Sequence, residues 1–296
     1  MKIFLGISLS KKNYKHLEKL LKSLLLLEIP NNYTLKIIFI IENKNFHFKK
    51  IIEKTLLKKN YTILLTKFEG IPQSRNQFLK YTRNYKSKYM GFLDDDCIVA
   101  RQWLKNMINF IKKTNCDVVG GPQLHKVKND YYLSLFDLIE PKRIHGQKVD
   151  WIATNNAFLK SKILINKNLL FDEKLKNIGG SDQLFFKKLS MMNFRCRWNV
   201  TSKVIENIHA NRENINWFLK RNLRYGYSGN YIDKKIYGFI IGSFLSILKI
   251  IYMLSISSTL FFLFLKKNNF YNSFFYLYRS AGRFLGLINY TPKKYI

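Results

Sequence analysis

Three consecutive aspartates, Asp94, Asp95 and Asp96, directly follow the apolar run YMGFL at residues 89–93. Carboxylates at positions i and i+2 after a strand can direct two oxygen ligands towards one site. Mg²⁺ and Mn²⁺ prefer oxygen ligands, and magnesium commonly binds through one or two carboxylates plus the phosphates of a substrate. The run therefore predicts a metal site that holds a nucleoside diphosphate, although most acidic triplets are solvated turns.

Strands and helices alternate along the chain up to this acidic run. Apolar β-rich runs predict strands at residues 2–9, 35–43, 61–66 and 89–94, and helical spacing of apolar residues predicts helices at 14–24, 48–59 and 72–84. Asn13 is placed to cap the first of these helices. Such alternation indicates right-handed crossovers and a parallel sheet covered on both faces, which is the α/β fold class.

The fold class places the acidic residues on one edge of the sheet. Ligands of open α/β sheets bind beyond the carboxyl ends of the strands. The aspartate run closes the fourth predicted strand there, and Glu42 closes the second. In the helix predicted after the aspartates, Trp103, Met107, Ile108 and Ile111 recur at helical spacing and predict its buried face.

The composition indicates a globular, strongly basic protein. The 296 residues are 47% hydrophobic and carry a formal net charge of +32, which suggests nucleic acid, an anionic membrane or phosphorylated substrates as partners. An A/T-rich genome explains much of the lysine equally well. Cys97, Cys116 and Cys196 show neither disulfide nor zinc spacing, which fits a reducing cytosol. The apolar run at the N-terminus is too short for a secretory signal peptide.

The last sixty residues differ in composition from the rest of the chain. Residues 236–265 are apolar apart from Lys249 and scattered Gly and Ser, and residues 270–290 are aromatic and basic. Either the two segments pack on the preceding domain as helices, or they associate with a membrane. Positive residues flank the long segment on both sides, which disfavours a single span and favours a re-entrant or interfacial pair. We expect one domain at 1–232 and membrane-associating helices at 233–296.

Eight motifs follow one another in order over residues 1–230. They are FLGISLSKKNYKHLEKLLKSLL, IIFIIEN, GIPQSRNQFLKY, YMGFLDDD, DVVGGP, WIATNNAFLKSKIL, FDEKLKNIGGSDQLFFKKL and RNLRYGYS. In this order they resemble the GT-A fold of family 2 glycosyltransferases, which are inverting enzymes that use nucleotide-sugar donors. The resemblance implies a GT-A type fold with a mainly parallel central sheet flanked by helices, followed here by hydrophobic C-terminal helices.

The resemblance also implies a donor site. Glu42 would contact the nucleobase or ribose, and Arg75 would shape the nucleotide pocket. Asp94 would face the ribose, Asp96 would bind the Mn²⁺ or Mg²⁺ that bridges the diphosphate, and Asp95 could take either task. The alternative for Glu42 is an ordinary solvated acid at a strand end. Arg75 could also form a salt bridge to the aspartate loop, and the two roles are compatible.

The stretch GGSDQLFF resembles the family's G-G-E-D motif, whose aspartate is the expected general base. That residue is Asp182, with the helix N-cap as its alternative role, while Ser181 departs from the usual Glu. The stretch RNLRYG resembles the [QR]-x-x-R-W element with Tyr225 in place of Trp, so Arg221 and Arg224 would meet the diphosphate or the acceptor. His209 matches a family position at which a histidine often approaches the metal or the diphosphate.

Further residues of these motifs would line the site. Residues 117–122 and the pair Asn155 and Asn156 would form the floor where donor sugar and acceptor meet. Trp151 either stacks on a sugar ring or packs in the core.

The expected partners are a nucleotide-sugar donor, a glycan or lipid-linked acceptor in cell-envelope polysaccharide synthesis, and the cytoplasmic face of the membrane. No nucleic acid is expected, because the lysines are dispersed and the acidic motif repels phosphates. A basic nucleic-acid-binding protein nevertheless stays open as an alternative. So does a catalytically inactive transferase-like scaffold, because of Ser181 and Tyr225. A nucleotidyltransferase is disfavoured, because the Gly-rich phosphate loop near the N-terminus is missing.

Overall fold

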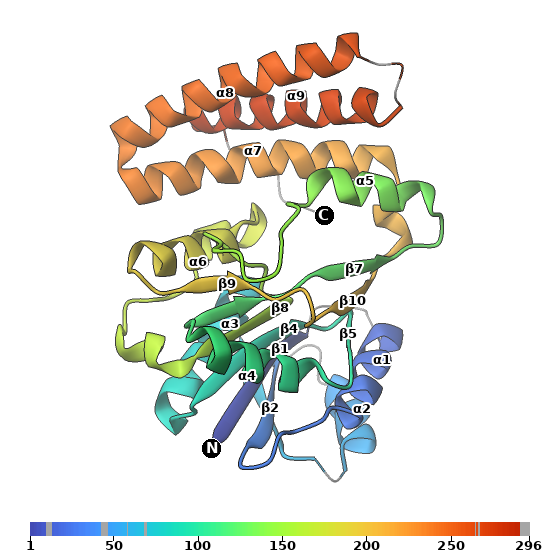
Figure 1. Cartoon of the computed structure of the whole chain (residues 1–296), viewed down its shortest axis with the longest axis vertical. Coiled ribbons are helices and arrows are strands. Elements are labelled where there is room, and N and C mark those ends of the chain that lie inside the picture. The colour runs from blue at the N-terminus through green and yellow to red at the C-terminus, as the bar shows by residue number, and fades with distance from the viewer. Residues whose placement is uncertain are drawn as a thin grey trace. The chain divides into compact units, whose positions relative to one another are not determined.

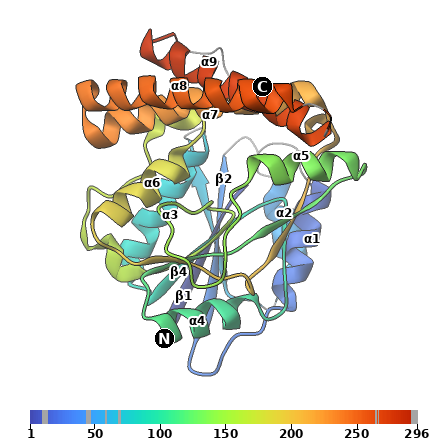
Figure 2. The same cartoon turned by 45° about the horizontal axis from the view of Figure 1, so that its top comes forward.

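The computed structural model describes residues 1–9, 14–42, 47–57, 59–67, 70–263, 265 and 267–290. The chain forms two compact units, each assembled from three segments. The first comprises Met1–Leu124, Arg143–Glu173 and Ser181–Asn207, and the second comprises His125–Lys142, Lys174–Gly180 and Ile208–Ile296. Figure 1 labels the elements of both units, and Figure 2 shows them after a rotation of 45°.

The first unit is built on a seven-stranded sheet with the order β3-β2-β1-β4-β8-β6-β9. Its first four strands are parallel. These strands and their connecting helices are β1 (Lys2–Leu9), α1 (Tyr14–Leu25), β2 (Thr34–Glu42), α2 (His47–Thr55), β3 (Tyr61–Thr66), α3 (Ile71–Tyr85) and β4 (Tyr89–Asp94). The predicted alternation of strands and helices is thereby confirmed, while the predicted cap Asn13 lies outside the described residues.

The remaining strands make the sheet mixed. β8 (Asn156–Lys160) runs antiparallel to β4 and to β6 (Val118–Gly120), and β9 (Cys196–Trp198) is parallel to β6. A second, three-stranded sheet has the order β5-β10-β7, formed by β5 (Cys97–Val99), β10 (Val204–Asn207) and β7 (Gln123–Lys126). The connections include α4 (Trp103–Thr114), α6 (Ser181–Met191) and the short 3₁₀ helices η2 (Ser161–Ile165), η3 (Glu173–Asn177) and η4 (Ala210–Arg212).

Helices bury both faces of the large sheet. One hydrophobic core joins the sheet to α1, α2 and α4, and a second joins it to α3, η2 and α6. The predicted inner face of α4 is confirmed, because Trp103, Met107, Ile108 and Ile111 are at most 1% exposed. On the other face, Gly6 lets the ring of Phe78 lie directly on β1, since a Cβ at position 6 would stand 2.5 Å from that ring.

The second unit is helical. It contains α5 (Tyr131–Ile139), α7 (Ile215–Tyr237), α8 (Phe239–Phe262) and α9 (Lys267–Leu287), and the last three pack side by side (Figure 1). A core around Phe136, Phe218 and Phe275 joins α5, α7 and α9. The domain boundary predicted after residue 232 falls inside α7, which is continuous there and packs with α8 and α9.

Candidate active site

The aspartate run lies at the predicted edge of the sheet. Asp94 ends β4 opposite Ser8 of β1, and Cys97 begins β5 two residues after Asp95. Asp95 and Asp96 are each only 7% exposed, and the Asp94 side chain retains 39% of its surface. A solvated turn would leave such carboxylates in water, so the structure argues against that alternative. Burying charged groups is costly unless they are paired or bind a cation.

Arg75 is the cation that faces Asp94. Its Nη2 atom lies 3.2 Å from Oδ1 of Asp94, and its guanidinium group lies over the ring of Phe171, with 5.7 Å to the centroid. Arg75 itself is 7% exposed. It sits in the first turns of α3, a helix that begins after Gly70 with a proline in its first turn, as proline favours. The salt bridge weighed for Arg75 from the sequence is therefore present.

Arg75 does not fully offset the effect of burial and acidic neighbours on Asp94. Burial raises the pKa of Asp94, Arg75 lowers it, and the neighbouring charges of Glu206 and Asp182 raise it again, with a net increase. A raised pKa means that the ionised carboxylate is held at a cost. Another positive charge would relieve this cost, as a divalent cation does.

Glu206 and Asn207 belong to this site although the sequence reading did not select them. Glu206 lies opposite Cys97 in the β5–β10 pair, and its Oε2 accepts a hydrogen bond of 3.2 Å from Gln123. Asn207 donates from both its backbone N–H and its Nδ2 to the carbonyl oxygen of Asp96, each at 3.1 Å. The signal in the sequence that could have identified them is the acid–amide pair that ends a short strand in the stretch IENIHANRE.

Asp182 is brought to the same edge by α6. It is half-buried in the first turn of that helix, where its Oδ1 accepts a hydrogen bond of 2.8 Å from the N–H of Gln183. A carboxylate is favourable at a helix N-terminus, so this position fixes the side chain without neutralising it. Its charge acts on the pKa of Asp94. The predicted base and the aspartate run are therefore electrostatic neighbours.

Two glycines form the turn that leads into α6. Gly179 and Gly180 have φ angles of 84° and 83°, in the left-handed region that only glycine adopts without strain. Both glycines belong to the second unit, and a Cβ at position 180 would lie 3.1 Å from Cβ of Ser228 on α7 of that same unit. The backbone two residues before Asp182 is thus packed tightly.

Glu42 lies on the same edge but is not adjacent to Asp94. It ends β2, opposite Thr66 of β3, and is half-buried. Because β1 lies between β2 and β4, two strand spacings, or about 10 Å, separate the two ends. Glu42 and the aspartate run are thus spaced to contact different parts of one extended ligand.

Three predicted residues, His209, Arg221 and Arg224, lie in the second unit. Arg221 donates from Nε to the hydroxyl of Tyr225 at 2.6 Å and lies 4.8 Å from the ring centroid of Trp217. The side chain of Arg224 packs against Gly179. His209 precedes η4, and its carbonyl accepts a hydrogen bond of 2.8 Å from Arg212.

The two asparagines at the predicted floor of the site differ. Asn156 is 1% exposed, and its amide bonds Trp103 at 2.8 Å, the carbonyl of Pro122 at 3.0 Å and that of Ser202 at 2.7 Å. It holds the fold together and has no amide atom left for a sugar. Asn155 immediately precedes β8, and its buried Oδ1 has no hydrogen-bond partner in the described part of the chain.

Trp151 supports the core interpretation rather than sugar stacking. Its ring packs on the second hydrophobic core, and the guanidinium group of Arg143 covers it at 4.7 Å from the centroid. Arg143 lies equally close, 4.6 Å, to the ring of Trp198.

The oxygen-rich edge fits a divalent cation. It offers the carboxylates of the aspartate run and Glu206, and the unpartnered amide oxygen of Asn155. Oxygen ligands of this kind suit Mg²⁺ or Mn²⁺. Within the described residues, however, no three His, Cys, Asp or Glu side chains converge enough to hold a metal ion alone. A cation here would need further ligands, such as the oxygens of a diphosphate.

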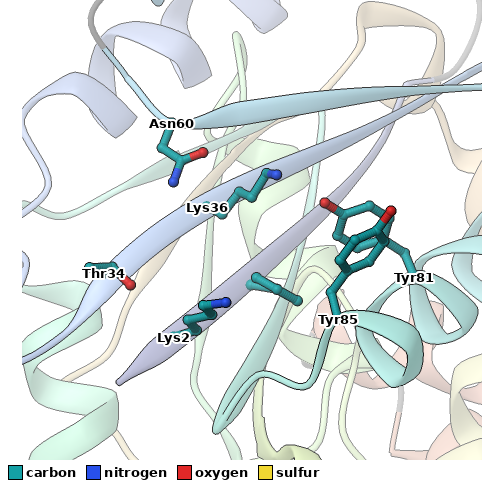
Figure 3. Close-up of a pocket in the computed structure, with 7 residues that line it drawn as sticks. Lys2, Thr34, Lys36, Asn60, Tyr81 and Tyr85 are labelled. Carbon is teal, nitrogen blue, oxygen red and sulfur yellow. The ribbon is translucent and has the colours of Figure 1, made fainter.

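A separate pocket of about 170 Å³ lies at the opposite edge of the sheet (Figure 3). Figure 3 shows the rings of Tyr81 and Tyr85 side by side on α3, facing Lys2 and Lys36 of the first two strands. Its lining residues are Lys2, Phe4, Thr34, Lys36, Asn60, Tyr81 and Tyr85. None of the predicted site residues is among them, so this pocket is distinct from the aspartate edge.

Comparisons with known proteins agree with this geometry. The sequence profile described as "Glycosyl transferase family 2" matches residues 10–169. The "Succinoglycan biosynthesis protein ExoM" of Rhizobium meliloti (strain 1021) is 23% identical over 232 residues, covering 75% of this chain and 73% of that protein.

Two solved structures share the fold of nearly the whole chain. The fragment TarS 1-349 of S. aureus in complex with UDP-GlcNAc is 13% identical, with a TM-score of 0.58 and coverage of 98% of this chain and 91% of that fragment. The mannosyltransferase PcManGT of Pyrobaculum calidifontis, in complex with GDP-Man and Mn²⁺, is 13% identical, with a TM-score of 0.65 and coverage of 97% and 87%.

Proposed function

Since the chain belongs to glycosyl transferase family 2 and is a glycosyltransferase, we propose that it transfers a sugar from a nucleoside diphosphate to a hydroxyl group with inversion at the anomeric carbon. The observation that carries the proposal is the burial of Asp95 and Asp96 beside the Arg75–Asp94 ion pair at the carboxyl edge of the sheet. The effect of the Asp182 charge on the pKa of Asp94 supports a base close to this edge. Relatives of the same fold bind UDP-GlcNAc or GDP-Man, which supports a nucleotide-sugar donor.

In the proposed reaction, Asp182 takes the proton of the acceptor hydroxyl. The acceptor oxygen then forms a bond to the anomeric carbon, while the bond from that carbon to the diphosphate oxygen breaks and its electron pair leaves with the diphosphate. A positioned base of this kind contributes about 10² to 10⁴-fold to the rate. The hydrogen bond from Gln183 supports this role, because it orients the carboxylate and leaves its second oxygen for the proton.

Donor binding is assigned to the aspartate edge. Asp96 would hold Mn²⁺ or Mg²⁺, which supplies positive charge to the leaving diphosphate. Arg75 and Asp94 form an ion pair that would fix the wall of the nucleotide pocket, and Asp95 and Glu42 would contact the nucleoside. The roles of His209, Arg221 and Arg224 stay predictions, because these residues belong to the second unit.

We further propose that the acceptor is a glycan or a lipid-linked sugar of a cell-envelope polysaccharide, and that the enzyme works at the cytoplasmic face of the membrane. The similarity to a succinoglycan biosynthesis protein supports the acceptor class. Among the described residues, one helix, α8, is long and apolar enough by length and composition to enter a membrane, which supports the location.

The first experiment measures thermal stabilisation of the purified protein by UDP-, GDP-, dTDP- and CMP-sugars, each with and without Mn²⁺ or Mg²⁺. A ligand that binds only the folded state raises the unfolding temperature. We expect a metal-dependent shift with one nucleotide. No shift with any donor, together with a clear shift on adding RNA, would replace this proposal by the nucleic-acid-binding alternative.

Variants then separate binding from transfer. Asp182→Asn retains an oxygen for Gln183 and should bind donor normally but transfer no sugar. Asp96→Ala should lose metal-dependent donor binding. Asp150→Asn makes the same chemical change at an exposed carboxylate and serves as the control. Wild-type transfer in both of the first two variants would contradict the site assignment.

A further inference from the structure

In helix α8 the buried residues are small or polar and most of the large apolar residues are exposed, which is the opposite of a surface helix in water. Its buried residues are small and include two hydroxyls: Gly242, Ser246 and Ser257. Its exposed residues are large and mostly apolar, and include Phe239, Ile240, Ile241, Phe244, Ile247, Leu248, Ile251, Tyr252, Leu254, Phe261 and Phe262. Surface helices of soluble proteins show the opposite pattern. A contiguous exposed apolar face along a whole helix marks an interaction site.

Polar contacts with α7 and α9 fix which face of α8 turns outward. The one charged residue of α8, Lys249, donates to Oδ2 of Asp233 on α7 at 2.8 Å, and Arg283 of α9 donates to the same oxygen at 2.8 Å. Ser246 accepts hydrogen bonds of 2.9 Å from Asn230 and from Arg283. Rotating the apolar face inward would break this buried network around Asp233, whose side chain is 3% exposed.

The length of α8 does not decide whether it crosses a bilayer or lies on it. Its 24 residues extend about 36 Å, enough for either arrangement. The helices packed along it do decide. Ser257 donates to the carbonyl of Ser273 on α9 at 2.8 Å, and Gly242 lies against Lys234 of α7. If α8 crossed the hydrocarbon, α7 and α9 would enter with it.

Those neighbours are unsuited to hydrocarbon. Helix α7 carries six charged side chains in 23 residues, with Arg224 near its middle, and a charged side chain inside the hydrocarbon is expensive. An orientation in the plane of the membrane keeps α7 and α9 in water and buries only the apolar face of α8.

Charge identifies the occupant of this face. The chain carries a net charge of +32, so two copies repel one another whereas an anionic bilayer attracts the protein. Exposed Lys235 lies four residues before α8 begins. Aromatic side chains stand at both ends of the helix, with Phe239 at the start and Phe261 and Phe262 at the end, as is common at the level of the lipid headgroups.

We propose that α8 lies in the plane of an anionic bilayer, with its apolar face between the headgroups and the acyl chains. This inference rests on the proposed membrane location but not on the chemistry of transfer. It makes the second unit a membrane-facing platform whose lipid-contacting layer is a single helix.

The first test is flotation of the full-length protein with phosphatidylcholine vesicles, with and without phosphatidylglycerol. Wild type should float with the anionic vesicles. Ile251→Glu and Ile240→Glu, at positions 60% and 82% exposed, should lose most of this binding while unfolding at the wild-type temperature. Ile165→Glu, at an 84% exposed position in the first unit, is the matched control and should float normally. Equal flotation of all four proteins overturns the proposal.

The second test measures depth. Phe244→Cys, Ile251→Cys and Phe262→Cys place single labels along one exposed stripe of α8, and the native cysteines Cys97, Cys116 and Cys196 are all buried. Quenchers attached to the lipids at known depths should report the same shallow depth for all three labels. A label at position 251 that is much deeper than the other two means that α8 crosses the bilayer, which overturns the in-plane orientation and leaves the attachment intact. No quenching at any position overturns the attachment as well.

Discussion

Replacing Gly180 by alanine tests how the backbone before Asp182 is held. The φ angle of 83° is strained for any residue with a Cβ, by about 1–2 kcal/mol. The new methyl group would also lie 3.1 Å from Cβ and 3.2 Å from Oγ of Ser228, and overpacking of this kind costs a further 1–3 kcal/mol or so. Relief requires the turn into α6 to shift, and Asp182 lies only two residues further along the chain.

We expect a selective loss of transfer. A displacement of about 1 Å at a catalytic group can lower the rate about 100-fold, so kcat should fall by that order while the donor dissociation constant changes little. The assay is transfer under saturating donor, with donor binding measured separately by calorimetry.

Gly146→Ala is the matched control for Gly180→Ala. Gly146 has a φ angle of 82° and no atom within 4 Å of a new Cβ, so this variant carries the strain without the collision. Adding Ser228→Gly to Gly180→Ala should restore part of kcat by removing the collision. If Gly180→Ala and Gly146→Ala lose equal stability and both keep wild-type kcat, the packing of the turn has no role in placing Asp182.

Three further substitutions test one contact at the opposite edge of the sheet and two contacts at the site. In Asp117, burial raises the pKa, but a hydrogen bond from Arg195 and the charges of Lys162 and Lys160 bring it below its usual value. Asp117→Asn should therefore lower the unfolding free energy by about 1–3 kcal/mol above about pH 4, which is the pKa of aspartate in the unfolded chain. The difference in unfolding free energy between wild type and variant should shrink as the pH falls further, and denaturant titrations at several pH values measure it. Asn207→Ala removes one hydrogen bond to the carbonyl of Asp96 and should cost about 1 kcal/mol and weaken metal-dependent donor binding; unchanged metal titrations would contradict its anchoring role. Arg75→Met leaves Asp94 beside Glu206 and Asp182 without its cation, and should lower donor affinity and the unfolding temperature measured without ligand.

The local pattern of the sequence was sufficient to predict the first half of the sheet. Strands β1 to β4 are nearly continuous apolar runs separated by amphipathic helices, and each depends on neighbours close in the chain. The place of the aspartates then follows from the rule that strand ends meet at one edge.

The anchoring contacts of the site could not be predicted in this way, because they join distant segments. Glu206 meets Cys97 through the pairing of β10 with β5, and a three-residue strand carries no signal for its partner. The motif predicts Asn156 as a residue of the binding site, but in the structure its amide forms hydrogen bonds with Trp103, Pro122 and Ser202. These three residues come from separate parts of the chain. Lys249 appeared as an isolated charge in an apolar segment, and its partner Asp233 lies on another helix.

The ion cluster in the second unit also has a consequence for synthesis of the chain. Asp233 leaves the ribosome before Lys249, so this pair can form as soon as α8 folds back on α7. Arg283 arrives last, and only then does Ser246 gain its second donor. Until α9 is made, the nascent chain presents an apolar helix whose orientation is only partly set. Synthesis of α9 therefore decides when the exposed apolar face of α8 acquires a fixed orientation.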